Sequence, residues 1–451
     1  MNDNHRQRIA DGQTALQRGA YQQAFNCFKE VYDADNGNLA AAVGVALSVG
    51  LSGNTDKAVE ILTDLLTNHP PQALVHEAMG IVLADARQFQ QAETHFRKAL
   101  RQTGFQPSLV SNLGTTLNEL SRFDEASAMF RRCLRKNPGD SSARYHLGLN
   151  QLLSGDYAQG WEGFALRNQV AGRPAPTAAH DIAVWQGEPL ADKRILLHAE
   201  QGLGDTIQFA RFAKSLAADG ATVFIACDPI LHDVLMTIDG VDGVFGSDDA
   251  LPALDYQTPL LDLPGLLGFT AETVPYRDGY ISVPESASAN AQASAVGGGP
   301  GRRVGLVWSG NPNNKTDAKR SIRLAELLPL LDIPGCTFCS LQIGSALTQL
   351  DDIPEALRPI NLFTGAAPLA DVARVLAGLD VLITVDTLMA HLAGAMGVPV
   401  WTMISHVPDW RWMLNRDDTP WYGSMRLFRQ AEIGDWSGTV ESLHAALNGS
   451  G

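Results

Sequence analysis

Charged side chains are scarce in this sequence, at 18% of 451 residues against about 25% in a typical soluble domain. Hydrophobic residues make up 45%. A disordered chain combines high charge with low hydrophobicity, so this composition excludes a chain that is disordered throughout. We expect two to four domains, because one domain usually takes about 100–200 residues.

Long hydrophobic runs are also missing. A membrane-spanning helix needs about 18–20 consecutive apolar residues, and the most apolar stretch, residues 375–401, is interrupted by Asp380, Asp386 and His391. The opening residues, MNDNHRQRIADG, contain no apolar core of the kind found in secretory signals. We therefore expect no membrane span, no secretory leader and a cytoplasmic location.

Basic residues and cysteines are few. There are 34 lysines and arginines against 49 acidic residues, for a formal net charge of −15. Proteins that bind nucleic acid usually carry a basic surface, so this balance argues against a nucleic-acid partner. Five cysteines argue against a disulfide framework and favour a reducing compartment. Cys336 and Cys339 form a lone C-x-x-C without further ligands nearby, so we expect buried strand thiols there.

Residues 5–165 repeat with a period of 34. A small residue recurs in each unit, a second follows twelve positions later, and a bulky side chain comes four positions after that. The columns are Gly12, Ala46, Gly80, Gly114 and Gly148; Ala24, Ala58, Ala92, Ala126 and Gly160; and Phe28, Leu62, Phe96, Phe130 and Phe164. Small residues let two helices cross closely, and bulky ones fill the gap against the next unit. The pattern resembles the tetratricopeptide repeat and predicts an all-helical solenoid over residues 1–170.

The predicted solenoid carries no chemistry of its own. Stacked helix pairs present a concave face that suits a peptide or a partner protein. We expect the repeats to bind a protein partner or acceptor. The alternative is a scaffold that packs on the second domain or joins copies of the chain into a homo-oligomer. The fifth unit departs from the pattern after Phe164, so we expect it to cap the array.

Beyond residue 186 short apolar runs alternate with helix-like segments, which predicts parallel sheets covered by helices on both faces. We expect one Rossmann-like half over residues 186–284, a linker rich in Ala, Ser and Gly over 285–301, and a second half over 302–451. The expected strands are 195–200, 222–227, 243–246, a segment near 255–264, 304–309, 337–342, 380–386 and 399–404; the expected helices are 206–220, 229–236, 322–331, 367–378 and 387–395. Ligands bind such sheets beyond the carboxyl ends of the strands, so a cleft between the halves is the expected site.

The first candidate motif is EQGLGDTIQ, residues 200–208, between an expected strand and an expected helix. Its glycines allow close approach of a ligand to the backbone, and Asp205 stands at the expected start of the helix. Asp205 is our candidate catalytic residue, with Gly204, Thr206 and Gln208 as candidate ligand-binding residues. Helix capping is the structural alternative for Asp205.

The second motif, WSGNPNNK, follows another expected strand. Residues 302–323 hold six cations, Arg302, Arg303, Lys315, Lys319, Arg320 and Arg323, against one acidic residue, Asp317. A basic cluster in an acidic protein indicates a phosphate ligand, and a solvated loop is the alternative. The candidate ligand-binding residues in this region are Trp308, Ser309, Gly310, Asn311, Lys319, Arg320 and Gln342.

A third motif joins the end of a buried strand to the start of a helix. Its candidate ligand-binding residues are Asp386, Thr387, Leu388, Met389 and His391. Free amides at a helix N-terminus bind diphosphates well, whereas His391 is equally suited to the cleft and to the core. A fourth segment, SHVPDWRW over residues 405–412, clusters Trp, Asp and Arg. Sugar binding, closure of the cleft and a small apolar core are all open for that segment.

Several motifs are absent. The α/β region has no D-x-D at a strand end, no G-x-S-x-G and no P-loop. We therefore expect no metal and no cofactor, and neither a hydrolase of the G-x-S-x-G type nor a P-loop NTPase.

Four segments, GLGDTIQFARF, RVGLVWSGNP, FCSLQIG and DTLMAHLAGAMGVPVW, resemble the bacterial tetratricopeptide-repeat glycosyltransferases. The α/β part is similar to the ADP-heptose lipopolysaccharide heptosyltransferases and, more distantly, to the O-linked N-acetylglucosamine transferases. The resemblance implies a GT-B fold and metal-independent, inverting transfer of a sugar from a nucleotide-sugar donor. It makes Asp205 the catalytic base, Arg320 or Lys319 the phosphate-binding residue, and the amides of Thr387–Met389 further donor contacts.

The heptosyltransferases lack the repeats and act on lipid, so the resemblance implies a protein acceptor here, modified on Ser or Thr, with flagellin as one candidate. Lipopolysaccharide or a surface polysaccharide is an alternative acceptor. A non-catalytic adaptor, with nucleotide on the α/β part and partners on the repeats, is another reading, and a two-domain nucleotide-sugar epimerase is a third. The sugar, the nucleobase, the acceptor, the oligomeric state and the orientation of Glu200 and His391 stay open.

Overall fold

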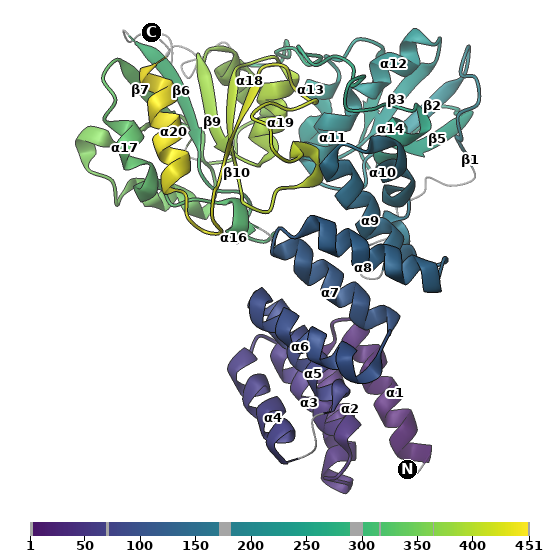
Figure 1. Ribbon diagram of the computed structural model, residues 1–451. Helices are drawn as coiled ribbons and strands as arrows, with labels where there is room; N and C mark the ends of the chain where they lie inside the picture. Colours follow the sequence, from purple (N-terminus) through teal and green to yellow (C-terminus); the bar gives the residue numbers. More distant parts are fainter. Residues whose placement is uncertain are drawn as a thin grey trace. The chain divides into compact units, whose positions relative to one another are not determined.

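The computed structural model describes residues 3–68, 72–170, 182–288, 301–314, 317–363 and 365–449. These residues form two compact units (Figure 1). The first unit is Met1–Gln151 with Glu162–Ala175, and the second is Leu152–Trp161 with Pro176–Gly451. Of the expected linker at 285–301, residues 289–300 lie outside the described residues.

The first unit is all-helical, and the unit boundary crosses its last two helices. In the described residues the helices are α1 (Asp3–Gln17), α2 (Tyr21–Ala34), α3 (Leu39–Leu51), α4 (Thr55–Asn68), α5 (Ala73–Asp85), α6 (Phe89–Thr103), α7 (Pro107–Glu119), α8 (Phe123–Lys136), α9 (Ser141–Ser154) and α10 (Tyr157–Phe164). From α2 to α10, equivalent helices of successive repeats begin 34 residues apart, so the predicted helical solenoid is confirmed.

The columns of small and bulky residues account for the helix crossings. A Cβ atom added at Gly80 would lie 2.5 Å from Phe96 Cε1. The ring of Phe28 lies against Gly12 of its own repeat, where an added Cβ would be 2.7 Å from the ring. The same ring lies against Gly44 of the next repeat. Because these aromatic rings are buried and occupy the space of the missing side chains, each glycine is required by packing.

The second unit contains two parallel sheets, with strand orders β1-β5-β2-β3-β4 and β11-β10-β9-β6-β7-β8 (Figure 1). The first sheet consists of β1 (Ala183–Val184), β2 (Arg194–His198), β3 (Thr222–Ala226), β4 (Val241–Phe245) and β5 (Tyr256–Pro259). The second consists of β6 (Arg302–Val307), β7 (Cys336–Ser340), β8 (Ile360–Asn361), β9 (Val381–Val385), β10 (Val400–Ile404) and β11 (Met425–Arg429). The predicted α/β organisation with parallel sheets is confirmed.

Helices connect these strands. They are α11 (Leu203–Ala210), α12 (Phe212–Ala218), α13 (His232–Leu235), α14 (Leu263–Leu266), α16 (Asp317–Arg320), α17 (Leu328–Leu331), α18 (Leu369–Ala377), α19 (Leu388–Ala395) and α20 (Ser437–Asn448). Strands β1, β8 and β11 and helices α14, α16 and α20 were not among the elements expected from the sequence. Both β1 and β8 have two residues, which is too short for an alternating pattern to register.

The single helix expected over 206–220 is wrong, because the helix is interrupted at Arg211 and the chain forms α11 and α12 instead. Arg211 is fully buried, and its guanidinium donates to the carbonyl oxygens of Gln208 at 2.8 Å and Trp421 at 2.6 Å. It also lies over the ring of Tyr422, 4.8 Å from the centroid. At this interruption the buried cation is therefore satisfied by carbonyl oxygens and aromatic faces.

The helix expected over 322–331 is also shorter than predicted. Leu324–Leu327 form a 3-10 turn and only Leu328–Leu331 form the α-helix α17. Pro329 stands in the first turn of α17. Proline has no amide proton and clashes with the preceding turn, so it is tolerated at a helix start but not inside one long helix.

Trp308 and Cys339, which the sequence analysis discussed, are buried in the second sheet. Trp308 has no exposed surface and packs among Val304, Leu306 and Val385 in the buried core. On β7, Cys339 is fully buried and Cys336 is partly buried, and both are free thiols. The side chains of Trp308 and Cys339 therefore contribute to the core of this sheet.

Candidate functional site

Helices α11 and α19 bring the first and third motifs side by side. Each helix follows a strand from the middle of its sheet: α11 follows β2, and α19 follows β9. The two helices approach each other closely at Gly204, where an added Cβ would lie 2.7 Å from Cδ2 of His391. The carboxyl ends of the two sheets therefore meet at this point, which is where open α/β sheets bind ligands.

Asp205 has two partners at the start of α11. Its Oδ2 accepts a hydrogen bond from the Gly202 amide at 3.0 Å, so it caps the helix. Its Oδ1 forms an ion pair with Arg411 Nη2 at 2.5 Å. The side chain keeps 19% of its exposure. Burial raises the pKa of the Asp205 carboxyl, and the charge of Arg411 opposes that rise. The capping alternative and the candidate site therefore involve the same carboxylate.

Arg411 comes from the fourth segment of the sequence analysis. It lies in the one-turn 3-10 helix Trp410–Trp412 and keeps 10% of its side-chain exposure. Besides Asp205, its Nη1 pairs with Asp409 Oδ1 at 2.8 Å, and its Nε donates to Gln208 Oε1 at 2.8 Å. One guanidinium from the second sheet's half thus holds three side chains. Sequence reasoning missed Arg411 as a site residue, and the clustered letters PDWRW were its only signal.

The third motif supplies a buried carboxyl and a buried imidazole. Trp412 Nε1 donates to Asp386 Oδ2 at 2.8 Å, and His391 Nε2 lies 3.9 Å from Asp386 Oδ1. His391 Nδ1 and Tyr422 Oη share a hydrogen bond of 2.9 Å. Burial raises the pKa of Asp386 and lowers the pKa of His391. The imidazole is therefore neutral near pH 7, and it faces α11 and the aromatic side chains.

The N-terminus of α19 lies beside Asp386. Thr387 occupies the N-cap position, and its side chain makes no capping hydrogen bond. Its Oγ1 lies 3.2 Å from the Thr384 Oγ1 instead. Thr387, Leu388 and Met389 are all half-buried. The structure thus places the expected diphosphate-binding amides next to the carboxyl and imidazole of the same motif.

The second motif is largely engaged with itself. Gln342 Oε1 accepts from the amides of Trp308 and Ser309, each at 3.0 Å. The Gly310 amide donates to Ser321 Oγ at 3.0 Å. Asn311 Oδ1 accepts from the Asn313 amide at 3.0 Å. The backbone amides of residues 308–310 are therefore engaged in hydrogen bonds within the protein, and the Gln342 side chain fixes the start of this loop.

Two cations of the second motif are placed on α16. Lys319 is half-buried, and Arg320 keeps 22% of its side-chain exposure and pairs with Asp317 at 3.1 Å. The positive charge of Arg320 is one of the influences that oppose the burial-driven rise in the pKa of Asp386. Arg320 therefore brings this loop's charge toward the site, and Lys315 lies outside the described residues.

The remaining candidates of the first motif point inward. Thr206 is buried and its Oγ1 donates to the Gly202 carbonyl at 3.2 Å. Gln208 is fully buried beside Arg411. Glu200 is half-buried and its charge adds to the rise in the pKa of Asp205. The resulting cluster contains the carboxyls of Asp205, Asp386 and Asp409 with the guanidinium of Arg411, and it can exchange protons and bind an anion.

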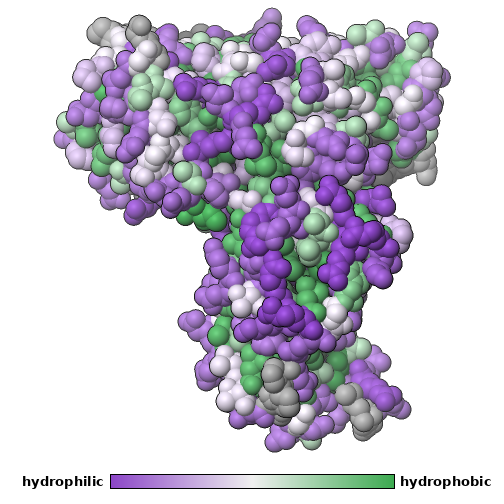
Figure 2. Space-filling view, viewed as in Figure 1, coloured by the Kyte–Doolittle hydropathy of each residue, from purple (hydrophilic) through white to green (hydrophobic). Residues whose placement is uncertain are grey.

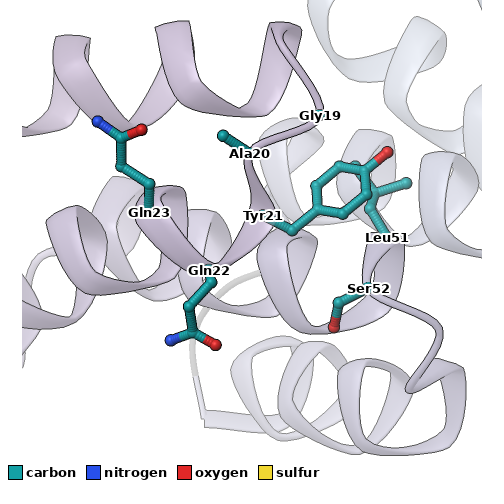
Figure 3. Close-up of a pocket in the computed structure, with 7 residues that line it drawn as sticks. All are labelled: Gly19, Ala20, Tyr21, Gln22, Gln23, Leu51 and Ser52. Atoms are coloured by element: carbon teal, nitrogen blue, oxygen red, sulfur yellow. The ribbon is translucent and has the colours of Figure 1, made fainter.

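A separate hollow lies in the first unit, at the turn between α1 and α2 and the end of α3 (Figure 3). It is lined by Gly19, Ala20, Tyr21, Gln22, Gln23, Leu51 and Ser52. Figure 3 shows the ring of Tyr21 beside Leu51, with Gln22 and Gln23 extending away. Its lining has no carboxylate, amine, guanidinium or imidazole.

No helix in the part of the chain that the structure describes is long and apolar enough to cross a membrane. No group of three or more His, Cys, Asp or Glu side chains there is arranged to hold a metal ion. On the face that Figure 2 shows, hydrophilic side chains predominate and hydrophobic ones form small groups between them.

Comparison with known proteins gives three kinds of similarity. The family model for the tetratricopeptide repeat matches residues 111–160. Protein FlbA of Caulobacter vibrioides is 26% identical over 417 residues, which cover 87% of this chain and 70% of FlbA. The chain therefore contains tetratricopeptide repeats, as its period predicts, and is similar to a bacterial protein over most of its length.

Two solved structures are similar over about a third of the chain. MamA AMB-1 is 22% identical, with a TM-score of 0.28, and the match covers 37% of this chain and 91% of MamA. TTC0263, a thermophilic TPR protein of Thermus thermophilus, is 17% identical, with a TM-score of 0.33, and the match covers 36% of this chain and 88% of TTC0263.

Proposed function

We propose that this chain is an inverting, metal-independent glycosyltransferase that moves a sugar from a nucleotide sugar to a protein acceptor in the cytoplasm. The observation that carries the proposal is the ion pair of Asp205 with Arg411, whose charge also acts on Asp386, at the place where the carboxyl ends of two parallel sheets come together. A partly exposed carboxyl with a raised pKa, beside an anion-binding guanidinium, suits attack of a hydroxyl on a diphosphate-linked sugar.

The proposed reaction assigns each proton and electron pair. The acceptor hydroxyl of a Ser or Thr gives its proton to the Asp205 carboxylate as its oxygen attacks the anomeric carbon from the side opposite the leaving group. The bond between that carbon and the diphosphate oxygen breaks, and the nucleoside diphosphate leaves with the electron pair. Because burial raises the pKa of Asp205, its carboxylate is a stronger base than an exposed aspartate.

The leaving diphosphate needs positive partners. Arg320 and Lys319 on α16 are the proposed charged groups, and the amides at Thr387–Met389 are the proposed neutral donors. The repeats of the first unit are the proposed site for the protein acceptor, since stacked helix pairs expose an extended surface for a peptide.

A second candidate function is a non-catalytic adaptor, favoured by one specific observation. Both oxygens of the Asp205 carboxylate already have partners, Gly202 and Arg411. An adaptor would keep this arrangement as a structural tie and use the α/β unit only to bind a nucleotide.

The deciding experiment incubates the full-length protein with a panel of nucleotide sugars and a cell extract, and reads donor hydrolysis and the mass of modified proteins. We expect transfer, and we expect Asp205→Asn to lower it by about 10²–10⁴-fold, the usual contribution of a general base. Asp418→Asn is the matched control, because Asp418 is 56% exposed and pairs with Arg416. Nucleotide binding without turnover in the unaltered protein would favour the adaptor.

A further inference from the structure

We infer that Arg411 is a binding residue for the diphosphate of the donor, and that its capture by the diphosphate releases Asp205 to act as the base. This inference rests on the proposed function. It concerns the segment 405–412, whose role the sequence left open, and it assigns a nucleoside diphosphate as the ligand.

In the structure, both oxygens of the Asp205 carboxylate have hydrogen-bond partners. Its Oδ1 is held by Arg411 Nη2 at 2.5 Å, and its Oδ2 by the Gly202 amide at 3.0 Å. An ion pair of this kind lowers the basicity of the carboxylate, so withdrawal of the cation makes Asp205 a stronger base for the acceptor hydroxyl. A competitor for Arg411 therefore favours turnover.

Arg411 is built to exchange one partner while keeping another. Asp409 lies in the same short turn, accepts from the Arg411 amide at 3.1 Å and pairs with Nη1 at 2.8 Å. This pair is local in sequence, whereas Asp205 belongs to α11, far along the chain. A guanidinium binds phosphate through two parallel N–H donors, so a diphosphate is a strong competitor for the Nη2 side of Arg411.

An unused donor stands beside Arg411. Gln208 is fully buried, and its Oε1 accepts from Arg411 Nε at 2.8 Å. Its Nε2 has no hydrogen-bond partner among the described residues. A buried amide donor without an acceptor is costly, and an anionic oxygen bound at Arg411 would satisfy it. The location also has access, because the side chains of Asp205 and Asp386 each keep 19% of their exposure.

The test measures binding of ADP, GDP and UDP by calorimetry to the full chain and to four variants: Asp205→Asn, Arg411→Met, the double variant and Asp409→Asn. Asp205→Asn removes the competitor, so we expect about three- to tenfold tighter binding of the preferred nucleotide. Arg411→Met removes the ligand's partner, so we expect binding about tenfold weaker or worse. The double variant should match Arg411→Met alone, since the competition no longer exists.

Asp409→Asn serves as the matched control, because it removes a carboxylate partner of Arg411 that the ligand does not replace. The nucleotide affinity of Asp409→Asn should rise less than the nucleotide affinity of Asp205→Asn. Equal affinity of Asp205→Asn and the unaltered protein, or additive effects in the double variant, would overturn the inference. Should Arg411→Met fail to fold by circular dichroism, the affinity of Asp205→Asn decides alone, since Asn can still accept from the Gly202 amide.

A pH profile separates release of the base from a static structural role. Arg411 opposes the rise in the pKa of Asp205, so Arg411→Met should move the acid limb of kcat/KM, which reports the free enzyme, to higher pH. The acid limb of kcat should stay in place, because the donor complex has already lost the ion pair. Movement of both limbs together would contradict release. No nucleotide binding to the unaltered protein would reject the proposed function as well, whereas binding and turnover without these shifts would reject only the release.

Discussion

The close packing of α11 against α19 requires that residue 204 have no side chain. Gly204→Ala would place a methyl group 2.7 Å from His391 Cδ2, and His391 is itself buried against Trp412 and Tyr422. We expect a loss of about 1–3 kcal/mol in the free energy of unfolding from this overpacking, measured in urea, together with weaker nucleotide binding.

Gly438→Ala is the control for that substitution. Gly438 lies near the start of α20 with nothing within 4 Å of an added Cβ, so alanine there should raise stability slightly, by less than about 1 kcal/mol. Equal effects of the two substitutions would show that the approach of α11 and α19 is not tight.

Single residues also mark the limit of prediction from sequence. Asp205 was predictable, because a glycine turn after an apolar run places the next acidic residue at a helix start. Arg411 and Arg211 were not, because their partners come from segments about two hundred positions away. No local spacing records which carboxylate or carbonyl oxygen a long side chain will reach. The sequence placed Gln342 and Trp308 at strand ends. It did not indicate that Gln342 would bind backbone amides of its own sheet or that the Trp308 ring would be buried in the core.

At the scale of elements, α5 and α6 bring together two histidines, His76, which is buried, and His95, which is half-buried. His76 Nδ1 lies 3.1 Å from His95 Nδ1, and burial, followed by the charges of His76 and Lys98, lowers the pKa of His95 to about 4. The neutral form is therefore favoured in the folded state. The stability that this provides is complete above the ordinary histidine pKa and is lost as pH falls through about 4.

We expect His95→Gln to flatten the loss of solenoid stability between neutral pH and pH 4, because glutamine keeps a polar side chain but takes up no proton. Melting curves of the two proteins across that range, followed by circular dichroism, measure the difference. Parallel pH dependence in both proteins would show that His95 does not control the acid response of these helices.

Elements were predicted where pattern and length agreed. The repeat helices and the central strands β2, β3, β6, β9 and β10 have long apolar patterns and were expected. The break between α11 and α12 was not, since both parts share one amphipathic pattern and only a buried arginine separates them.

For the whole molecule, the unit boundary gives the sharpest expectation. Leu152–Trp161 belongs to the second unit, where Trp161 Nε1 donates to the Phe269 carbonyl at 3.0 Å and its ring lies 5.4 Å from that of Trp410. A truncated chain of residues 152–451 should fold and bind nucleotide but fail to modify a protein acceptor. A chain of residues 176–451 should melt about 5–10 °C lower, because it exposes the aromatic partners of Tyr157 and Trp161.

Differential scanning calorimetry of the two truncated chains, with nucleotide titration of each, tests this expectation. Identical melting temperatures would mean that residues 152–161 do not stabilise the α/β unit. Full-rate modification of the acceptor by the chain of residues 152–451 would show that the repeats do not recruit it. The 34-residue pattern placed the end of the solenoid at residue 170, but it does not record that part of its fifth repeat packs with the second unit.

The tryptophans around Arg411 allow the site to be followed by intrinsic fluorescence. Trp410 lies 5.0 Å from the Arg411 guanidinium and 5.9 Å from the ring of Trp421, while Trp412 stacks on His391. Indole emission responds strongly to a nearby charge and to exchange of energy between neighbouring rings. The protein thus carries its own fluorescent reporter of the guanidinium's position, and the tryptophans on other elements, such as Trp185, Trp308 and Trp436, supply a steady background against which its movement can be read.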